Sequence, residues 1–181
     1  MKLTKLLAQK KAPIVGRWLD FIFETYPDDA QRFLTKQKDR FANPVGTTIS
    51  KEIENLYDEL IEGLEPDRVS PLLDRIIRIR AIQDFSPSQA VNFVFLLKKA
   101  IKKEILGEIL EDQLSEDLAI MESRIDDLAL LAFDIYMSCR EKLYDIRANE
   151  AKNQVSKLLQ RAGMISEIPD KKPGVKKEGM P

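Results

Sequence analysis

No proline or glycine occurs between Ser115 and Gly163, and this feature limits the possible folds more than any other in the sequence. Proline and glycine are the residues that most often end a helix. An uninterrupted helix here would hold about 46 residues and would extend for about 70 Å, which is longer than a small domain. The sequence therefore predicts a long C-terminal helix.

The second half of this predicted helix, from about residue 147, is mostly polar. Its remaining apolar residues form a thin seam: Ala148, Ala151, Val155, Leu158 and Leu159. A thin apolar seam on a long helix is typical of pairing with a second helix. We expect a homodimer that forms through the long C-terminal helix.

Apolar residues upstream recur at the spacing of a helix face rather than that of a strand. Phe33 and Leu34 are expected to point inward, and Asn43 to Gly46 are expected to form a type I turn. Gly63 is a candidate C-cap. The predicted helices are Pro13 to Pro27, about 29–38, about 48–62, and Pro66 or Pro71 to near Asp84. Together with the later segments, they predict an all-α fold of about six helices.

The strongest helix start in the sequence is at Ser86. Ser86 as N-cap, Pro87 at the first position and Gln89 at the third match a capping box. Apolar residues occupy more than one stripe of the helix that begins here, so we expect it to be the most buried one.

Composition excludes several classes of function. The chain has no histidine, which removes the commonest general base and metal ligand. Its formal net charge is −1, whereas nucleic-acid binders usually carry a basic excess. We find no phosphate-binding or nucleophile motif and no carboxylate spacing typical of a calcium loop. We therefore expect no catalytic residues, no metal, no cofactor and no nucleic-acid partner.

Several features favour the cytoplasm. A single cysteine, Cys139, cannot form an internal disulfide and is expected to be buried and inert rather than a redox sensor. The apolar residues near the N-terminus are interrupted by Gln9, Lys10 and Lys11 before a signal peptide could form. No apolar run is long enough to span a membrane. Residues 164–181, rich in lysine, proline and glycine, are predicted to be a disordered tail.

The densest polar cluster beside apolar helices runs from Arg78 to Gln89. A guanidinium group and the amides at a helix start can together hold a carboxylate or phosphate, so this segment is a candidate anion or ligand pocket. Its polar side would be formed by Arg78, Arg80, Gln83 and Asp84. The alternative is a structural corner in which Arg80 pairs with Asp84 and the serine and glutamine only cap the helix.

Trp18 and a group of lysines also have two interpretations. Trp18 could line a ligand cavity, but a plain core position is the more common role for such a residue. Lys98, Lys99, Lys102 and Lys103 could form a nucleic-acid or lipid surface. The alternative, which we favour, is that the acidic beginning of the last helix lies antiparallel to them and offsets their charge.

Three motifs together resemble a known family. They are Trp18 with Tyr26-Pro27, the segment Phe41-Ala42-Asn43-Pro44-Val45-Gly46, and the run from Arg78 to Val91, RIRAIQDFSPSQAV. They resemble the N-terminal sensor domain of RsbRD-type stressosome co-antagonists, which is also found at the front of some bacterial histidine kinases. The resemblance covers about residues 5–110, and its long third motif is quite specific.

This resemblance implies a bacterial signalling input domain with a globin-like helical fold that lacks haem and dimerises through its helices. We expect a sensor domain over 5–112, a long helix over 113–163 that completes the bundle and continues as a dimer or linker helix, and the tail. The chain has no room for a phosphorylatable output domain, so a stand-alone regulator is expected. It would act non-enzymatically through ligand- or partner-dependent helix packing and a protein partner. The alternative is a structural adaptor without a small-molecule ligand; an enzyme is the least favoured interpretation.

Overall fold

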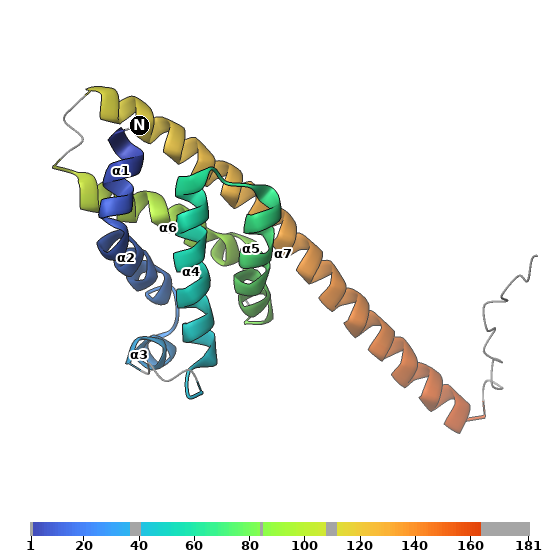
Figure 1. Ribbon diagram of the computed structural model, residues 1–181. Coiled ribbons are helices and arrows are strands. Elements are labelled where there is room, and N and C mark those ends of the chain that lie inside the picture. Colours follow the sequence, from blue (N-terminus) through green and yellow to red (C-terminus); the bar gives the residue numbers. More distant parts are fainter. Residues whose placement is uncertain (1, 37–40, 84, 108–111, 164–181) are drawn as a thin grey trace, which may run out of the picture. The chain divides into compact units, whose positions relative to one another are not determined.

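The computed structural model describes residues 2–36, 41–83, 85–107 and 112–163. Within these ranges all regular secondary structure is helical, which confirms the all-α prediction. The helices are α1 (Lys2–Gln9), α2 (Lys11–Phe23), α3 (Asp28–Lys36), α4 (Pro44–Glu62), α5 (Pro66–Ile82), α6 (Pro87–Ile105) and α7 (Asp112–Arg161) (Figure 1). The chain divides into two compact units, Met1–Glu141 and Lys142–Pro181.

Two helix pairs form the centre of the first unit, α2 with α6 and α4 with α5 (Figure 1). The α2–α6 pair is fixed by Trp18, whose indole Nε1 donates a 2.6 Å hydrogen bond to the carbonyl of Phe93. In the α4–α5 pair, Glu52 is buried and receives a 2.8 Å hydrogen bond from Arg75. Buried side chains with satisfied polar groups thus hold both pairs together.

The first helix, α1, is not among the predicted ones. Leu3 and Leu7, four residues apart, are both buried on one face of it. The phenol of Tyr57 in α4 donates a 2.9 Å hydrogen bond to the carbonyl of Leu7. A helix of eight residues has little stability of its own, so these tertiary contacts are what stabilise it.

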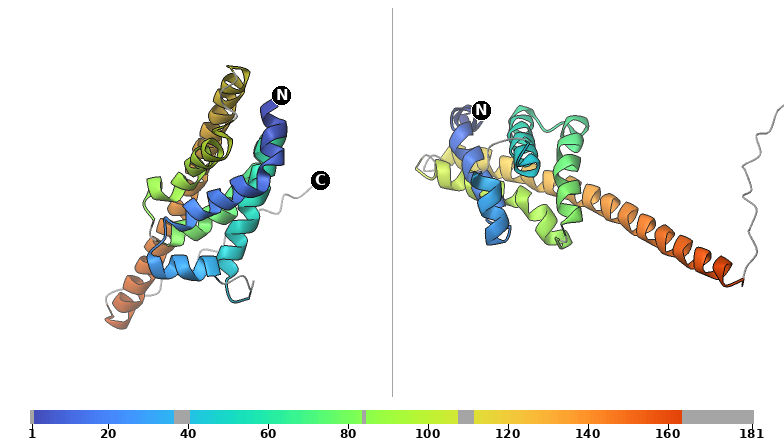
Figure 2. Two further views of the ribbon diagram at one scale, coloured as in Figure 1. Left: turned by 90° about the vertical axis from the view of Figure 1, so that its left-hand side faces the viewer. Right: turned by 90° about the horizontal axis from the view of Figure 1, so that it is seen from below.

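The third helix, α3, bridges the end of α2 and the beginning of α4 (Figure 2). Leu34 is buried, as predicted, but Phe33 is 51% exposed, so the prediction that it points inward is wrong. Neighbouring residues on a helix point about 100° apart, and this short helix buries only one narrow stripe.

The predicted type I turn at Asn43 to Gly46 is instead the first turn of α4. Asn43 is the N-cap: its side-chain oxygen accepts a 2.8 Å hydrogen bond from the amide of Gly46, and its side-chain amide donates to the carbonyl of Leu34 at 3.0 Å. The first turn of a helix repeats the dihedral angles of a type I turn, which explains why the sequence signal is the same. At the other end Gly63 is the C-cap, as predicted.

The start of α6 agrees with the prediction in detail. Ser86 is the N-cap, Pro87 is the first residue, and Ser86 and Gln89 form both hydrogen bonds of a capping box. On α6, Lys98 pairs with Asp126 and Lys102 pairs with Glu122 of α7, which confirms charge compensation by an antiparallel helix for these two lysines. The ammonium groups of Lys99 and Lys103 instead lie over the ring of Phe21.

The long helix predicted after Ser115 is present as α7, which is continuous from Asp112 to Arg161. Its part in the first unit buries eight residues: Leu114, Leu118, Met121, Ile125, Leu128, Ala129, Ala132 and Tyr136. Its part in the second unit is almost entirely exposed. The predicted tail, 164–181, lies outside the described residues. No described helix is long and apolar enough to cross a membrane.

Replacement of Gly46 tests the beginning of α4. A Cβ at this position would overlap the side-chain amide of Asn43. We expect Gly46→Ala to lower the free energy of unfolding by about 1–3 kcal/mol, because the overpacked cap must shift and lose its hydrogen bonds. Urea denaturation followed by the fluorescence of Trp18, the single tryptophan, measures this change.

Gly16→Ala in α2 is the matched control, since a Cβ there meets nothing within 4 Å. It should leave the stability unchanged or raise it by up to about 1 kcal/mol. Equal effects of the two substitutions would contradict the close approach at Asn43.

Candidate functional site

The structure separates the two arginines that the sequence singles out. Arg78 is exposed and donates a 2.6 Å hydrogen bond to Asp74, one turn earlier on α5. Arg80 has no exposed surface at all. Two residues of an α-helix that are two positions apart point about 200° apart, so only one of these side chains can face the core.

Arg80 lies in a cage of aromatic rings. Its guanidinium carbon is 4.3 Å from the ring centre of Phe85, 5.4 Å from that of Tyr26 and 5.8 Å from that of Phe93. The rings of Tyr26 and Phe85 also meet edge to face, with centres 5.3 Å apart. A cation over aromatic faces is attracted by about 0.5–2 kcal/mol, so the cage offsets part of the cost of burying the charge.

The hydrogen bonds of the guanidinium are incomplete. Nη2 donates to the hydroxyl of Thr25 at 3.2 Å and to the carbonyl of Gln89 at 3.1 Å. Nε and Nη1 have no hydrogen-bond partner, and neither does the buried phenol oxygen of Tyr26. Among the described residues, no carboxylate pairs with Arg80.

Burial affects the ionisation of both groups. It lowers the pKa of Arg80, because the charged form is kept from water. It raises the pKa of Tyr26, although the positive charge of Arg80 acts in the opposite direction. The phenol and the guanidinium are therefore close enough to influence each other, even though the phenol oxygen lacks a hydrogen bond of good geometry.

A pocket of about 410 Å³ adjoins the guanidinium. It is lined by Thr25, Tyr26, Pro27, Ala30, Gln83, Phe85 and Gln89. Two of these residues, Thr25 and Gln89, bind Nη2, and a third, Phe85, stacks on the guanidinium. The volume is sufficient for a small organic molecule.

Three helix ends build this pocket. The end of α2 leads into Thr25 and Tyr26, the end of α5 carries Arg80, and the capping box at the start of α6 fixes Gln89. The helix α7 contacts the same region: the phenol of Tyr136 donates to the carbonyl of Phe85 at 3.0 Å, and Arg140 donates to that of Ala81 at 3.4 Å.

Among the other predicted site residues, Gln83 is exposed and lines the pocket. Trp18 is fully buried between α2 and α6 and lines none of the pockets described here. Asp84 lies outside the described residues. Ligand binding by these five residues stays a prediction: Gln83 lines the pocket, Arg80 contacts four of the residues that line it, and Arg78 is exposed and pairs with Asp74.

Sequence reasoning missed Tyr26, Thr25 and Phe93 as neighbours of Arg80. One signal was available for Arg80 itself, because the buried stripe Val69, Leu73, Ile76 and Ile77 of α5 continues to it at helical spacing. Tyr26 and Phe85 occur in the motifs that indicate the family, but nothing in the sequence places them together.

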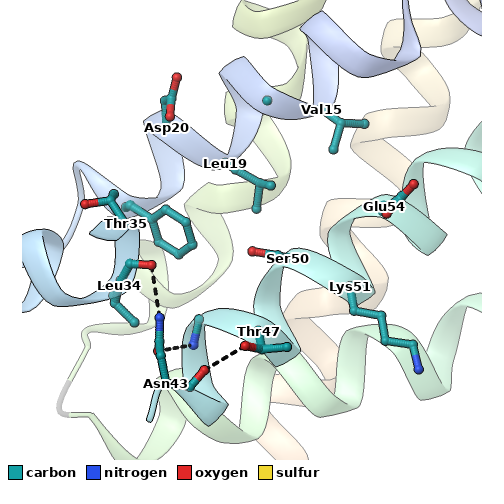
Figure 3. A pocket seen from close by; sticks show the side chains of 13 residues that line it. Val15, Leu19, Asp20, Leu34, Thr35, Asn43, Thr47, Ser50, Lys51 and Glu54 are labelled. Atoms are coloured by element: carbon teal, nitrogen blue, oxygen red, sulfur yellow. Dashed lines mark hydrogen bonds between the residues drawn. The ribbon is translucent and has the colours of Figure 1, made fainter. Parts of the chain in front are cut away.

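A second, larger cleft of about 720 Å³ lies between α2, α3 and α4 (Figure 3). Val15, Leu19 and Leu34 give it apolar walls, and Asp20, Thr35, Ser50, Lys51 and Glu54 form a polar rim. None of the buried polar atoms found without a partner in the described part of the chain lies in this cleft. Within the described ranges, no group of three acidic or cysteine side chains is placed to hold a metal ion.

Comparison with known proteins gives one family match and one curated relative. The model of the family "RsbT co-antagonist protein rsbRD N-terminal domain" matches residues 12–151. An uncharacterized protein of Archaeoglobus fulgidus is 25% identical over 144 residues, which is 76% of this chain and 82% of that protein. No solved structure matches the chain.

Replacement of Trp18 tests its placement in the core. We expect Trp18→Phe to lower the free energy of unfolding by about 3 kcal/mol, because it removes buried volume and the hydrogen bond from the indole to the Phe93 carbonyl. Chemical denaturation followed by circular dichroism measures the loss. An unchanged stability would contradict a core role and favour the cavity-lining interpretation.

The pKa of the Tyr26 phenol is sensitive to the positive charge of Arg80. Since burial raises the pKa of the phenol above its ordinary value of 10.0, its proton is retained in the folded state at pH values where the unfolded chain loses it. The free energy of unfolding should therefore fall as the pH rises above about 10. Arg80→Met should raise the pKa of Tyr26 further, because a neighbouring positive charge is lost.

Nuclear magnetic resonance of [¹³Cζ]-tyrosine over an alkaline pH series separates this group from the other three tyrosines. Arg78→Met is the control and should leave the pKa of Tyr26 unchanged. A pKa that does not respond to Arg80→Met would show that the two groups are not adjacent.

Proposed function

The chain belongs to the family of the RsbT co-antagonist protein rsbRD N-terminal domain, and from this premise we propose that it is a non-enzymatic input domain that regulates a partner protein. The family is one of signalling and regulatory domains. A haem-free, globin-like core is part of the proposal, and the absence of histidine supports it because haem is most often held by that residue.

One observation carries the mechanism: α7 contributes eight buried residues to the first unit and continues without interruption into the second. A change in how α7 packs in the first unit therefore alters the same helix that enters the second unit. A signal can favour one packing only by binding the two arrangements with different affinity.

We place homodimerisation on α7. In the first unit Leu130, Phe133 and Met137 are exposed at a spacing of three and four residues. In the second unit Val155 and Leu158 are likewise exposed, and Ala151, Val155 and Leu159 line a shallow groove. Apolar residues at this spacing on an exposed helix favour pairing with a second helix.

A structural adaptor without a small-molecule ligand is the alternative. It is favoured by the complete burial of Arg80, since a guanidinium that no ligand reaches would serve only the packing of three helix ends. The two proposals share the dimer and differ in whether a small molecule changes it.

Leu158→Glu tests the dimer. Placing a carboxylate in the apolar seam should weaken dimerisation by roughly 30-fold or more, since burial of an unpaired charge costs at least about 2 kcal/mol. Native mass spectrometry and sedimentation of the full chain measure the monomer–dimer equilibrium.

Asn153→Glu is the matched control, because it adds the same charge to another exposed position of α7, about 200° round the helix from Val155. It should leave the equilibrium nearly unchanged. A wild-type protein that is monomeric at high concentration, or equal effects of the two variants, would refute the dimer.

A further inference from the structure

The guanidinium of Arg80 presents three N–H donors that no acceptor uses, one on Nε and two on Nη1. The surrounding rings offer their faces, but a π face does not satisfy N–H groups that lie in the plane of the guanidinium. Buried donors without acceptors are rare in proteins and costly. The unused N–H donors of Arg80 therefore indicate a hydrogen-bond acceptor that is not part of the described chain.

The positive charge of the buried guanidinium also indicates a missing partner. A buried arginine normally has a carboxylate beside it, because the cost of removing the charge from water is otherwise several kcal/mol. Within the described ranges, Arg80 is in contact with a hydroxyl, a carbonyl and three aromatic rings, none of which is an anion. The missing partner is thus expected to be negatively charged.

We infer that the pocket beside Arg80 is a binding site for the carboxylate group of a small organic acid. Arg80 supplies the charge, the phenol of Tyr26 supplies a further donor, and the exposed amide side chains of Gln83 and Gln89 stand at the pocket's edge. This inference names the ligand of the input domain proposed above and rests on that proposal for its regulatory consequence, but not for binding itself.

A carboxylate fits the pocket better than an inorganic phosphate. None of the residues described as lining the pocket is itself charged, and the guanidinium of Arg80, which contacts four of them, carries one positive charge that matches the single charge of a carboxylate. Pro27, Ala30 and Phe85 give the rest of the lining an apolar character that suits a short hydrocarbon body. A phosphate dianion would leave a charge without compensation in this environment.

Binding requires a small movement, because Arg80 has no exposed surface. Phe85 both stacks on the guanidinium and lines the pocket, so its ring is one that an acid reaching the guanidinium would contact. Its carbonyl is held by Tyr136 of α7. Displacement of Phe85 by a bound acid would therefore be transmitted to the helix that the proposed function uses for output.

The test titrates the ¹⁵N-labelled full chain with sodium butyrate, acetate, succinate and phosphate, against sodium chloride of equal ionic strength. The arginine Nε–Hε cross-peaks are observed, and that of Arg80 is identified by its loss in Arg80→Met. Butyrate should move this peak saturably and raise the melting temperature by about 4 °C or more near saturation. Phosphate should have no larger effect than chloride.

Three variants accompany the titration. Arg80→Met should abolish the response of the melting temperature to butyrate, and Arg78→Met, the matched control, should preserve it. Tyr26→Phe should weaken butyrate binding about tenfold, because it removes one donor while keeping the ring. If Arg80→Met fails to fold, the rise of the wild-type melting temperature with butyrate and its weakening in Tyr26→Phe still decide the question.

The inference is overturned if none of the three carboxylates moves the Arg80 peak more than chloride does, or if phosphate alone does so. It is also overturned if the wild type gives no response but Asp84→Asn gains one, because Asp84 is then the internal counter-ion. Saturable binding that leaves the dimer equilibrium unchanged would support the site and refute its regulatory role. A dimer without any acid response would support the adaptor instead.

Discussion

The ends of α2 and α5 and the start of α6 meet around one buried guanidinium, that of Arg80. Arg80, at the end of α5, is covered by Tyr26 after α2 and by Phe85 and Phe93 around the start of α6. An apolar residue of similar length would fill the same space without a desolvation cost of several kcal/mol. The aromatic cage and two hydrogen bonds recover only part of that cost. Because no carboxylate in the described part of the chain pairs with Arg80, the rest of that cost has no visible compensation, and the carboxylate site proposed above supplies one.

Structural features that depend on a few neighbouring residues were predicted well from the sequence. The capping box of Ser86 and Gln89, the C-cap at Gly63 and the uninterrupted α7 each depend on local hydrogen bonds or on the absence of helix-breaking residues. The helical class results from apolar residues that recur at the same period along the chain. The pairing of Lys98 with Asp126 was also predictable, since consecutive helices joined by a short connection are usually antiparallel neighbours.

Features that depend on distant residues were not predicted. The cage around Arg80 brings together Tyr26 and Phe93, which are far from it in sequence. The short helix α1 is stabilised by a hydrogen bond from Tyr57, 50 residues away. Asn43 was assigned to a turn because a helix cap differs from a turn only in the conformation of the residues after Gly46. The different environments of Arg78 and Arg80 could have been predicted from the sequence, because only Arg80 continues the buried stripe of α5.

The contacts of α7 with the candidate site limit how strongly the site can influence that helix. Tyr136 donates to the carbonyl of Phe85, just before α6, and Arg140 donates to that of Ala81, near the end of α5. A change in the separation of these two helix ends must break or displace both hydrogen bonds. Each contributes about 0.5–1.5 kcal/mol net, so together they can couple the pocket to α7 by about 1–3 kcal/mol. Coupling free energies of that size are typical of allosteric proteins and correspond to a change in affinity of roughly 5- to 150-fold. In the proposed mechanism, this pair of hydrogen bonds is the contact through which a ligand in the pocket would act on α7.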